Sequence, residues 1–275
     1  MTALRILAAL SLLSLTACSE KAPATAANSA TDSDAANGSP PPPIHYDQTT
    51  VFTSDGQPAD ERNYRFLLDA CQKSGFPLHA LTSSEVEKIG REHVEAWIGP
   101  DKLARHDENW RFHVEVSAPC QFSLIHEDHT EIADASGRNT RIDNVTHEVD
   151  VQETGKWWPV TAMPADEGEV TEGDRHTGWS KQGIANANGA QCAIWQDSFG
   201  FQVCVWSGGG RWGYSSHGST ALHDDLSSGD AIVLWTYPAS TGASWKLETR
   251  EFSVGKALDR RAFALPENST RSTPP

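Results

Sequence analysis

Apolar residues recur at two different spacings along this chain, and each spacing predicts a different element. Over residues 59–74 the spacing is three to four positions, which is typical of a helix with one buried face. The apolar residues of this stretch are Tyr64, Leu67, Leu68 and Cys71. Gly75 ends the predicted helix. Residues 84–98 are predicted to form a second helix, begun by a capping box at Thr82 or Ser84.

Alternation of apolar and polar residues predicts strands in the middle of the chain. Residues 110–117 alternate throughout, as expected for a strand with one buried face. Residues 122–126 continue this pattern into a predicted turn at 127–128. A further strand is expected over residues 145–151, with a return strand at 157–160.

The last third of the chain is predicted to be almost entirely β. Residues 191–196 and 201–206 form a predicted hairpin, because Asp197 opens turns well and Gly200 tolerates positive φ. Two further strands are expected, at 231–237 and 245–254. The predicted fold class is therefore α+β, with a mainly antiparallel sheet and two short N-terminal helices.

Composition divides the chain into segments of different character. An acidic loop separates two folded regions that are expected to share one core. The predicted segments are a signal peptide (1–17), a lipidated cysteine with a disordered tether (18–48), an α+β region (49–165), a β-rich region (166–266) and a disordered tail (267–275).

The N-terminus carries the strongest functional signal. A single positive charge at Arg5 precedes the apolar stretch Ile6–Leu15, which is shorter than the roughly 20 residues that a membrane span needs. The sequence Leu15-Thr16-Ala17-Cys18 then resembles the lipobox of bacterial lipoproteins. This resemblance implies cleavage after Ala17 and acylation of Cys18 with chains such as palmitate. Ser19, in the position of a sorting signal, favours the outer membrane, with the protein facing the periplasm.

The other cysteines fit an exported protein. With Cys18 assigned to lipid, the remaining four are Cys71, Cys120, Cys192 and Cys204. An even number in an oxidising compartment favours two disulfides. Folding the predicted hairpin about residue 198 places Cys192 opposite Cys204, which leaves Cys71 to pair with Cys120. These pairings also remove both hairpin cysteines as candidate Cys–His nucleophiles.

Charge excludes some partners. The chain has 22 Lys and Arg against 37 Asp and Glu, a formal net charge of −15. Such a balance argues against nucleic-acid binding and against electrostatic docking on anionic lipid. The predicted membrane contact is the lipid anchor alone, and the predicted partner is an envelope protein or a lipid or glycan ligand.

Histidine and carboxylate residues are also concentrated in a few segments. The run His126–His129, with Glu131 and His113 nearby, contains possible zinc ligands. A turn offers no helical face that would bring them together, so we expect a polar hairpin tip and predict no metal site. The acidic residues of 166–174 lack the EF-hand spacing and are expected to form a solvated linker.

Motifs for catalysis and cofactor binding are missing. Residues 215–225 contain serine, histidine and aspartate without a Gly-x-Ser-x-Gly elbow, so we expect a polar loop. Gly208–Arg211 lacks the strand and the Gly-Lys-Ser/Thr ending of a phosphate-binding loop. We therefore predict no catalytic residues and no cofactor.

Tryptophans are the remaining candidates for binding. Alternation in the hairpin places Trp195 on one face and Trp206 on the other, with Cys192 and Cys204. Core packing is one explanation for these tryptophans, and an apolar or sugar-binding surface is the other. The candidate surface residues are Trp206, Trp212, Trp235 and Trp245.

These observations lead to a functional prediction. We expect a non-enzymatic, lipid-anchored envelope protein that binds a partner protein or an envelope ligand through this Trp-rich β surface. The alternatives are a peptidoglycan-acting hydrolase and a periplasmic immunity or inhibitor protein. For the fold, Phe252–Asp259 and Phe263–Pro266 resemble the closing strands of periplasmic lipoprotein-carrier-like sheets.

Overall fold

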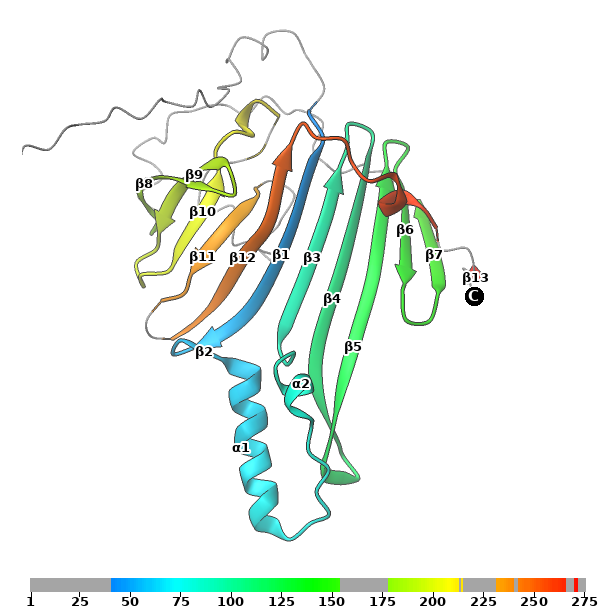
Figure 1. The fold of residues 1–275 in the computed structure, drawn as a ribbon, viewed down its shortest axis with the longest axis vertical. Coiled ribbons are helices and arrows are strands. Elements are labelled where there is room, and N and C mark those ends of the chain that lie inside the picture. The colour runs from blue at the N-terminus through cyan, green and yellow to red at the C-terminus, as the bar shows by residue number, and fades with distance from the viewer. Residues whose placement is uncertain are drawn as a thin grey trace, which may run out of the picture. The chain divides into compact units, whose positions relative to one another are not determined.

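The computed structural model describes residues 41–153, 178–212, 214, 231–239, 242–265 and 270–271. All of these residues belong to one compact unit, which is built on a single sheet (Figure 1). The strands run in the spatial order β13-β7-β6-β5-β4-β3-β1-β12-β11-β10-β9-β8, with the short β2 paired to β1. Every pairing is antiparallel except that of β13 with β7. The predicted mainly antiparallel sheet is confirmed.

The first half of the chain supplies the strands at the centre and at one side of the sheet. Their bounds are β1 Ile44–Ser54, β2 Gln57–Pro58, β3 Arg91–Ile98, β4 Lys102–Glu115, β5 Ala118–Asp134, β6 Arg138–Asp143 and β7 Glu148–Glu153. Those of the second half are β8 Ser180–Ala187, β9 Ala190–Gln196, β10 Gln202–Trp206, β11 Val233–Tyr237, β12 Ala243–Val254 and β13 Thr270–Arg271.

The central strand β1 corrects the predicted tether. Residues 44–48 were assigned to a disordered segment, but they pair with β3 on one side and with β12 on the other. Ile44 and Tyr46 are buried and alternate with the half-buried His45 and Asp47. This stretch looks polar in the sequence because only every second side chain faces the core. Residues 18–40 lie outside the described part of the chain.

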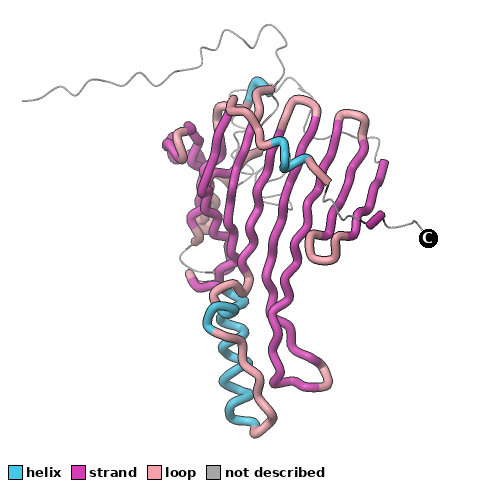
Figure 2. The backbone as a smooth tube through the Cα atoms, turned by 45° about the vertical axis from the view of Figure 1, so that its right-hand side comes forward, coloured by secondary structure: helices cyan, strands magenta, loops and turns pink. Residues whose placement is uncertain are grey.

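Helix α1 (Ala59–Ser74) confirms the first predicted helix. It ends at Gly75, whose φ of 75° is the left-handed conformation that glycine adopts without strain. Its buried side chains, Tyr64 and Cys71, pack on a hydrophobic cluster with residues of β4 and β5. Figure 2 shows α1 standing beside the hairpin formed by these two strands. No helix among the described residues is both long and apolar enough to span a bilayer.

The second predicted helix is wrong for most of its length. Only α2 (Ser83–Val86) is helical, and the capping box between Thr82 and Glu85 forms as expected. Gly90 then turns the chain with a φ of 68°, and residues 91–98 form β3. The buried residues of β3 alternate with half-buried ones, which is the period of a strand. Pairing with β1 and β4 therefore overrides the local helical spacing.

The predicted turn at 127–128 is also wrong. Strand β5 runs through these residues, and Glu108 of β4 lies directly opposite Asp128. The predicted strand over 145–151 begins only at Glu148, because residues 144–147 form a turn in which His147 has a φ of 62°. Residues 157–160 lie outside the described part of the chain.

The predicted disulfides are confirmed, with one change in register. Cys71 pairs with Cys120, and Cys192 pairs with Cys204. In the hairpin, however, Cys192 lies opposite Trp206, so the two cysteines are diagonal neighbours on one face. The turn is one residue longer than predicted because the Asp197 carboxylate accepts hydrogen bonds from the Phe199 and Phe201 amides.

The C-terminal strands match their predicted positions closely. Strands β11 and β12 cover most of 231–237 and all of 245–254. Of the segments that resemble lipoprotein-carrier-like sheets, Phe252–Val254 end β12, whereas Phe263 is the last residue of the 3₁₀ helix η5 (Arg260–Phe263) and belongs to no strand.

Candidate functional site

One of the four tryptophans predicted to form a binding surface is buried in the structure. Trp206 is only 4% exposed and packs among the rings of Trp212, Tyr214 and Phe252 in the core. It cannot be a surface residue, because its face of the hairpin is covered. Burial also raises the pKa of the Tyr214 hydroxyl beside it.

The other three predicted tryptophans are half-buried. Trp212 and Trp235 pack against the same core cluster as Trp206. Trp245 contacts Phe52, with ring centroids 5.1 Å apart. It also lines an apolar recess at the end of β12, together with Phe199 and Phe201. Core packing therefore involves Trp206, Trp212 and Trp235, whereas Trp245 borders the recess.

The glycine run has a packing role too. A Cβ atom at Gly209 would lie 2.6 Å from the Trp206 ring and 2.7 Å from Tyr214. Only glycine fits there, because the chain passes directly over the buried indole. The segments 166–174 and 215–225, with their acidic and serine–histidine residues, lie outside the described part of the chain.

The histidine-rich run of β5 is divided between the two faces of the sheet. We call the face on which α1 packs the front face. His126 and Asp128 lie on the front face, whereas His129 and Glu131 lie on the back, with His113. The six residues considered as zinc ligands from the sequence thus do not form one group. They lie mid-strand and not at a hairpin tip.

The back-face residues are engaged with one another. Hydrogen bonds from Asn109 and Arg111 hold the pKa of the Glu127 carboxyl below its usual range. His129 lies 3.7 Å from Asp107, whose carboxylate also pairs with Arg105 at 2.8 Å. A polar groove of about 310 Å³ lies beside these side chains. Basic residues thus accompany the acidic ones on this face.

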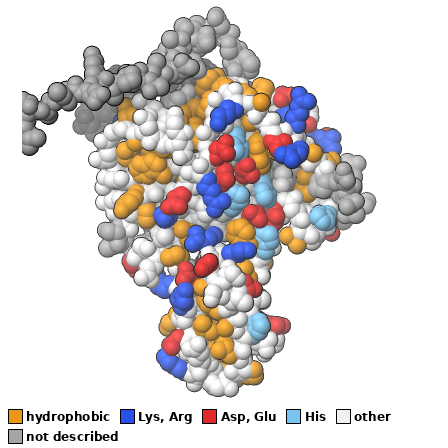
Figure 3. All heavy atoms as spheres, in the orientation of Figure 1, with side chains coloured by type: hydrophobic (Ala, Val, Ile, Leu, Met, Phe, Trp, Pro, Cys, Tyr) orange, Lys and Arg blue, Asp and Glu red, His pale blue; other side chains and the backbone are white. Residues whose placement is uncertain are grey.

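The front face carries a different arrangement. On the front face, each of β1, β3, β4 and β5 carries one histidine that is followed two residues later by a carboxylate. The same spacing also occurs at His113/Glu115 and His129/Glu131, whose histidines lie on the back face. The four pairs are His45/Asp47, His93/Glu95, His106/Glu108 and His126/Asp128. Glu251 of β12 lies opposite Asp47 and extends the group. We call these nine residues the front-face cluster. Figure 3 shows histidines gathered among acidic side chains on this face.

Antiparallel register brings the four pairs into contact. His93 lies opposite Glu108, and Glu95 lies opposite His106. The His93 ring is 3.1 Å from Glu108 through Nδ1 and 3.0 Å from Asp47 through Nε2. His45 Nε2 lies 2.8 Å from Glu95, and His126 Nε2 lies 3.3 Å from the second oxygen of Glu108. The polar contacts of the cluster thus form three groups that cross the strands: His45 with Glu95 and Glu251, His93 with Asp47, Glu108 and His126, and His106 with Asp128.

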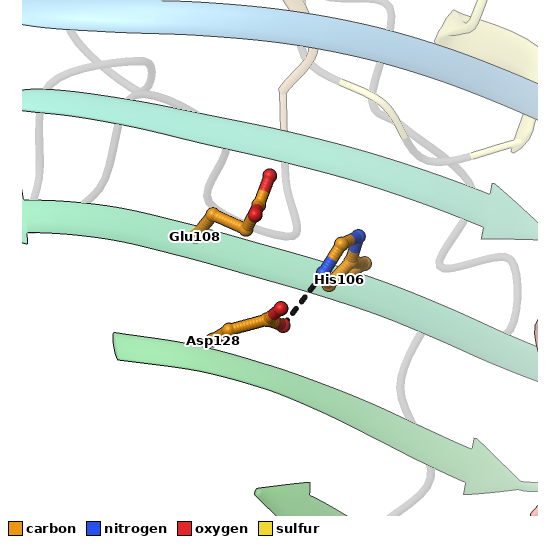
Figure 4. Close-up of side chains that lie close together, drawn as sticks. All are labelled: His106, Glu108 and Asp128. Atoms are coloured by element: carbon orange, nitrogen blue, oxygen red, sulfur yellow. Dashed lines mark hydrogen bonds and ion pairs between the residues drawn. The ribbon is translucent and has the colours of Figure 1, made fainter. Parts of the chain in front are cut away.

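Three residues of the cluster converge most tightly. His106 Nε2 and Asp128 Oδ1 are 2.8 Å apart, and Glu108 shares this face (Figure 4). One ligand atom from each of the three lies within 4.8 Å of those of the other two. His106 and Glu108 are two residues apart on β4, and Asp128 is the cross-strand neighbour of Glu108. The sheet itself thus fixes their relative positions.

Like charges face each other within the cluster. Asp47 lies opposite both Glu95 and Glu251, and Glu108 lies opposite Asp128. Such cross-strand pairs destabilise a sheet. Among the described residues, the ion pairs of these carboxylates are all with histidines and none is with lysine or arginine. Negative charge is therefore concentrated in this cluster without a direct lysine or arginine ion pair among the described residues, although Arg261 lines the recess beside His106 and Figure 3 shows other basic side chains on this face.

Aromatic rings and a recess border the cluster. His126 stacks on Trp110 at 5.1 Å between centroids, and His45 stacks on Trp97 at 5.5 Å. A recess of about 180 Å³ opens beside His106, between the sheet and η5. The rings fix the imidazole orientations, and the recess leaves His106 accessible from one side.

Sequence reasoning missed this cluster although its signal was present. The repeated His-x-acid spacing places both side chains on one face of a strand. Two of the four pairs fell in segments assigned to a tether and to a helix, which hid the common pattern. No protein-family model matches this chain, and no similar protein is found among curated ones.

Proposed function

We propose that this protein is a non-enzymatic, lipid-anchored binding protein of the bacterial cell envelope, and that its front-face cluster holds a cationic ligand. The observation that carries the proposal is the concentration of carboxylates in like-charge cross-strand pairs. This arrangement lowers stability unless a positive charge binds there. The lipobox at Leu15–Cys18 supports the anchor, with the outer membrane as the expected site.

A binding role suits the position of the cluster. Its histidine and carboxylate groups lie on a sheet face and hydrogen-bond to one another, in an arrangement suited to receiving positive charge. In this proposal the acidic surface takes the binding role that was predicted for the Trp-rich surface, of which Trp206 lies in the core. An acidic face is also what an immunity or inhibitor protein would present to a basic enzyme, so a basic protein is one possible outcome of the test.

The test compares the wild type with Glu108→Gln, which removes one charge from a like-charge pair while keeping the side-chain size. Glu115→Gln is the matched control, because Glu115 lies on the same strand but is exposed and outside the cluster. Without ligand, Glu108→Gln should be more stable by about 0.2–1 kcal/mol, because the repulsion from Asp128 is removed. Urea unfolding of the metal- and partner-free proteins measures this gain.

Ligand retention is measured on full-length protein crosslinked in its native envelope. Bound proteins, metals, lipids and glycans are all quantified after purification. We expect a cationic ligand on the wild type and on Glu115→Gln, and several-fold less on Glu108→Gln. Recovery of only a lipid or glycan, or equal retention by Glu108→Gln, contradicts the proposal. In the same preparation, mass spectrometry of the first mature peptide should show acyl chains on Cys18.

A further inference from the structure

We propose that the front-face cluster binds a divalent transition-metal ion of the Zn²⁺ class, with His106, Glu108 and Asp128 as its protein ligands. This inference rests on the proposed function and names its ligand. The three side chains offer one imidazole nitrogen and two carboxylate oxygens. Zinc takes both ligand types, whereas calcium and magnesium prefer sites made of oxygens alone.

The spacing of the ligand atoms suits a small ion. With metal–ligand bonds of about 2.0–2.2 Å, the ligand atoms of a tetrahedral zinc site lie about 3.4 Å from one another. His106 Nε2 and Asp128 Oδ1 are 2.8 Å apart, and all three atoms lie within 4.8 Å of one another. We expect rotation of the side chains to close this difference. The backbone needs no rearrangement, since neighbouring positions of two paired strands hold the three residues.

A second layer of hydrogen bonds orients the proposed ligands. His93 and His126 contact the two oxygens of Glu108, at 3.1 Å and 3.3 Å. The Asn144 amide donates to Asp128 at 2.5 Å. Partners of this kind fix the orientation of metal-binding carboxylates in known sites. Each proposed carboxylate ligand therefore already has a partner that holds it in place.

Charge and access agree with a bound cation. Glu108 and Asp128 together supply two negative charges at directly opposed positions, and a divalent ion between them removes their repulsion. The three side chains are between 19% and 25% exposed, so an ion can enter from solvent. The recess beside His106 leaves room for a fourth ligand from water or from a bound molecule.

The test titrates the purified full-length protein, made metal-free and carrying no histidine tag, with ZnCl₂ in a calorimeter. We expect one tight Zn²⁺ per chain, and the same protein should not take up Ca²⁺ with comparable affinity. His106→Ala should weaken zinc binding by more than about 100-fold, since losing even an outer partner costs about 10–100-fold. His113→Ala is the matched control, because His113 lies on the same strand and on the back face.

The variants separate this inference from the proposed function. A basic protein partner would depend on the charge of Glu108 and much less on the imidazole of His106, whereas a metal ion needs both. Front-face-dependent capture of a basic protein, without zinc binding, overturns the metal inference and leaves the proposed function standing. Equal zinc affinity in wild type and His106→Ala also overturns the inference. If Glu108→Gln retains zinc and any basic protein partner as well as the wild type does, both the metal inference and the proposed function are contradicted.

Discussion

Replacing Tyr64 with alanine should lower the free energy of unfolding by about 3–5 kcal/mol. Tyr64 is 1% exposed, and its ring meets Phe122 and Phe112 edge-on, at 5.1 Å and 5.8 Å between centroids. Its hydroxyl oxygen also accepts a hydrogen bond from the Leu81 amide at 3.0 Å. The substitution would leave a cavity at the place where α1 meets β4 and β5. It would also leave the Leu81 amide without its hydrogen-bond acceptor.

Urea unfolding followed by tryptophan fluorescence measures the effect. Tyr64→Phe is the control, because it keeps the ring and removes only the hydroxyl. We expect it to lose about 1–3 kcal/mol, the cost of leaving the Leu81 amide without a partner. A loss below about 1 kcal/mol for Tyr64→Ala would show that α1 does not pack on the sheet as described.

Removing the Cys71–Cys120 disulfide should have a similarly large effect. The bond closes a loop of sequence separation 49, for which chain entropy predicts about 4 kcal/mol of stabilisation. The Cys192–Cys204 bond closes a separation of 12 and should contribute about 3 kcal/mol. The first bond ties α1 to β5, so its loss should also loosen the helix.

Double alanine variants of each pair, unfolded in urea beside the wild type, measure both values. The Cys71/Cys120 variant should be the less stable of the two. Hydrogen exchange of the α1 amides should speed up in this variant and stay near the wild-type rate in the Cys192/Cys204 variant. Equal stability of the Cys71/Cys120 variant and the wild type would contradict a stabilising disulfide between α1 and β5.

Local signals predicted part of this fold well. Helix α1 is marked by its apolar spacing and by Gly75, and both belong to the helix itself. The hairpin of β9 and β10 is marked by alternation and by Asp197, so its two faces and its disulfide could be derived. In each case the residues that determine the structure lie within one short segment.

The structure of other segments depends on pairing with strands that are distant in the sequence. A helix over residues 84–98 is predicted from the helix-like spacing of Val86, Ile89, Val94, Trp97 and Ile98. Residues 91–98 become β3 instead, because β1 and β4 lie on either side of them. Strand β1 contains few apolar residues and owes its order to β3 and β12. Neither partner can be identified from the segment alone.

The candidate site was hidden for the same reason. Its residues span positions 45–251 and meet only through the register of five neighbouring strands. The His-x-acid repeat was visible, but its meaning depends on all four segments being strands that face the same way. One strand assigned to a tether and another to a helix were enough to conceal it.

The position of a bound metal ion is the decisive observation for the front-face cluster. Crystals of the full-length protein soaked in ZnCl₂, with anomalous differences recorded on both sides of the zinc edge, locate the ion. We expect one strong peak on the front face, about 2.0–2.2 Å from His106 Nε2 and from a carboxylate oxygen of both Glu108 and Asp128. A strong peak elsewhere, with none between these three side chains, would contradict the proposed site.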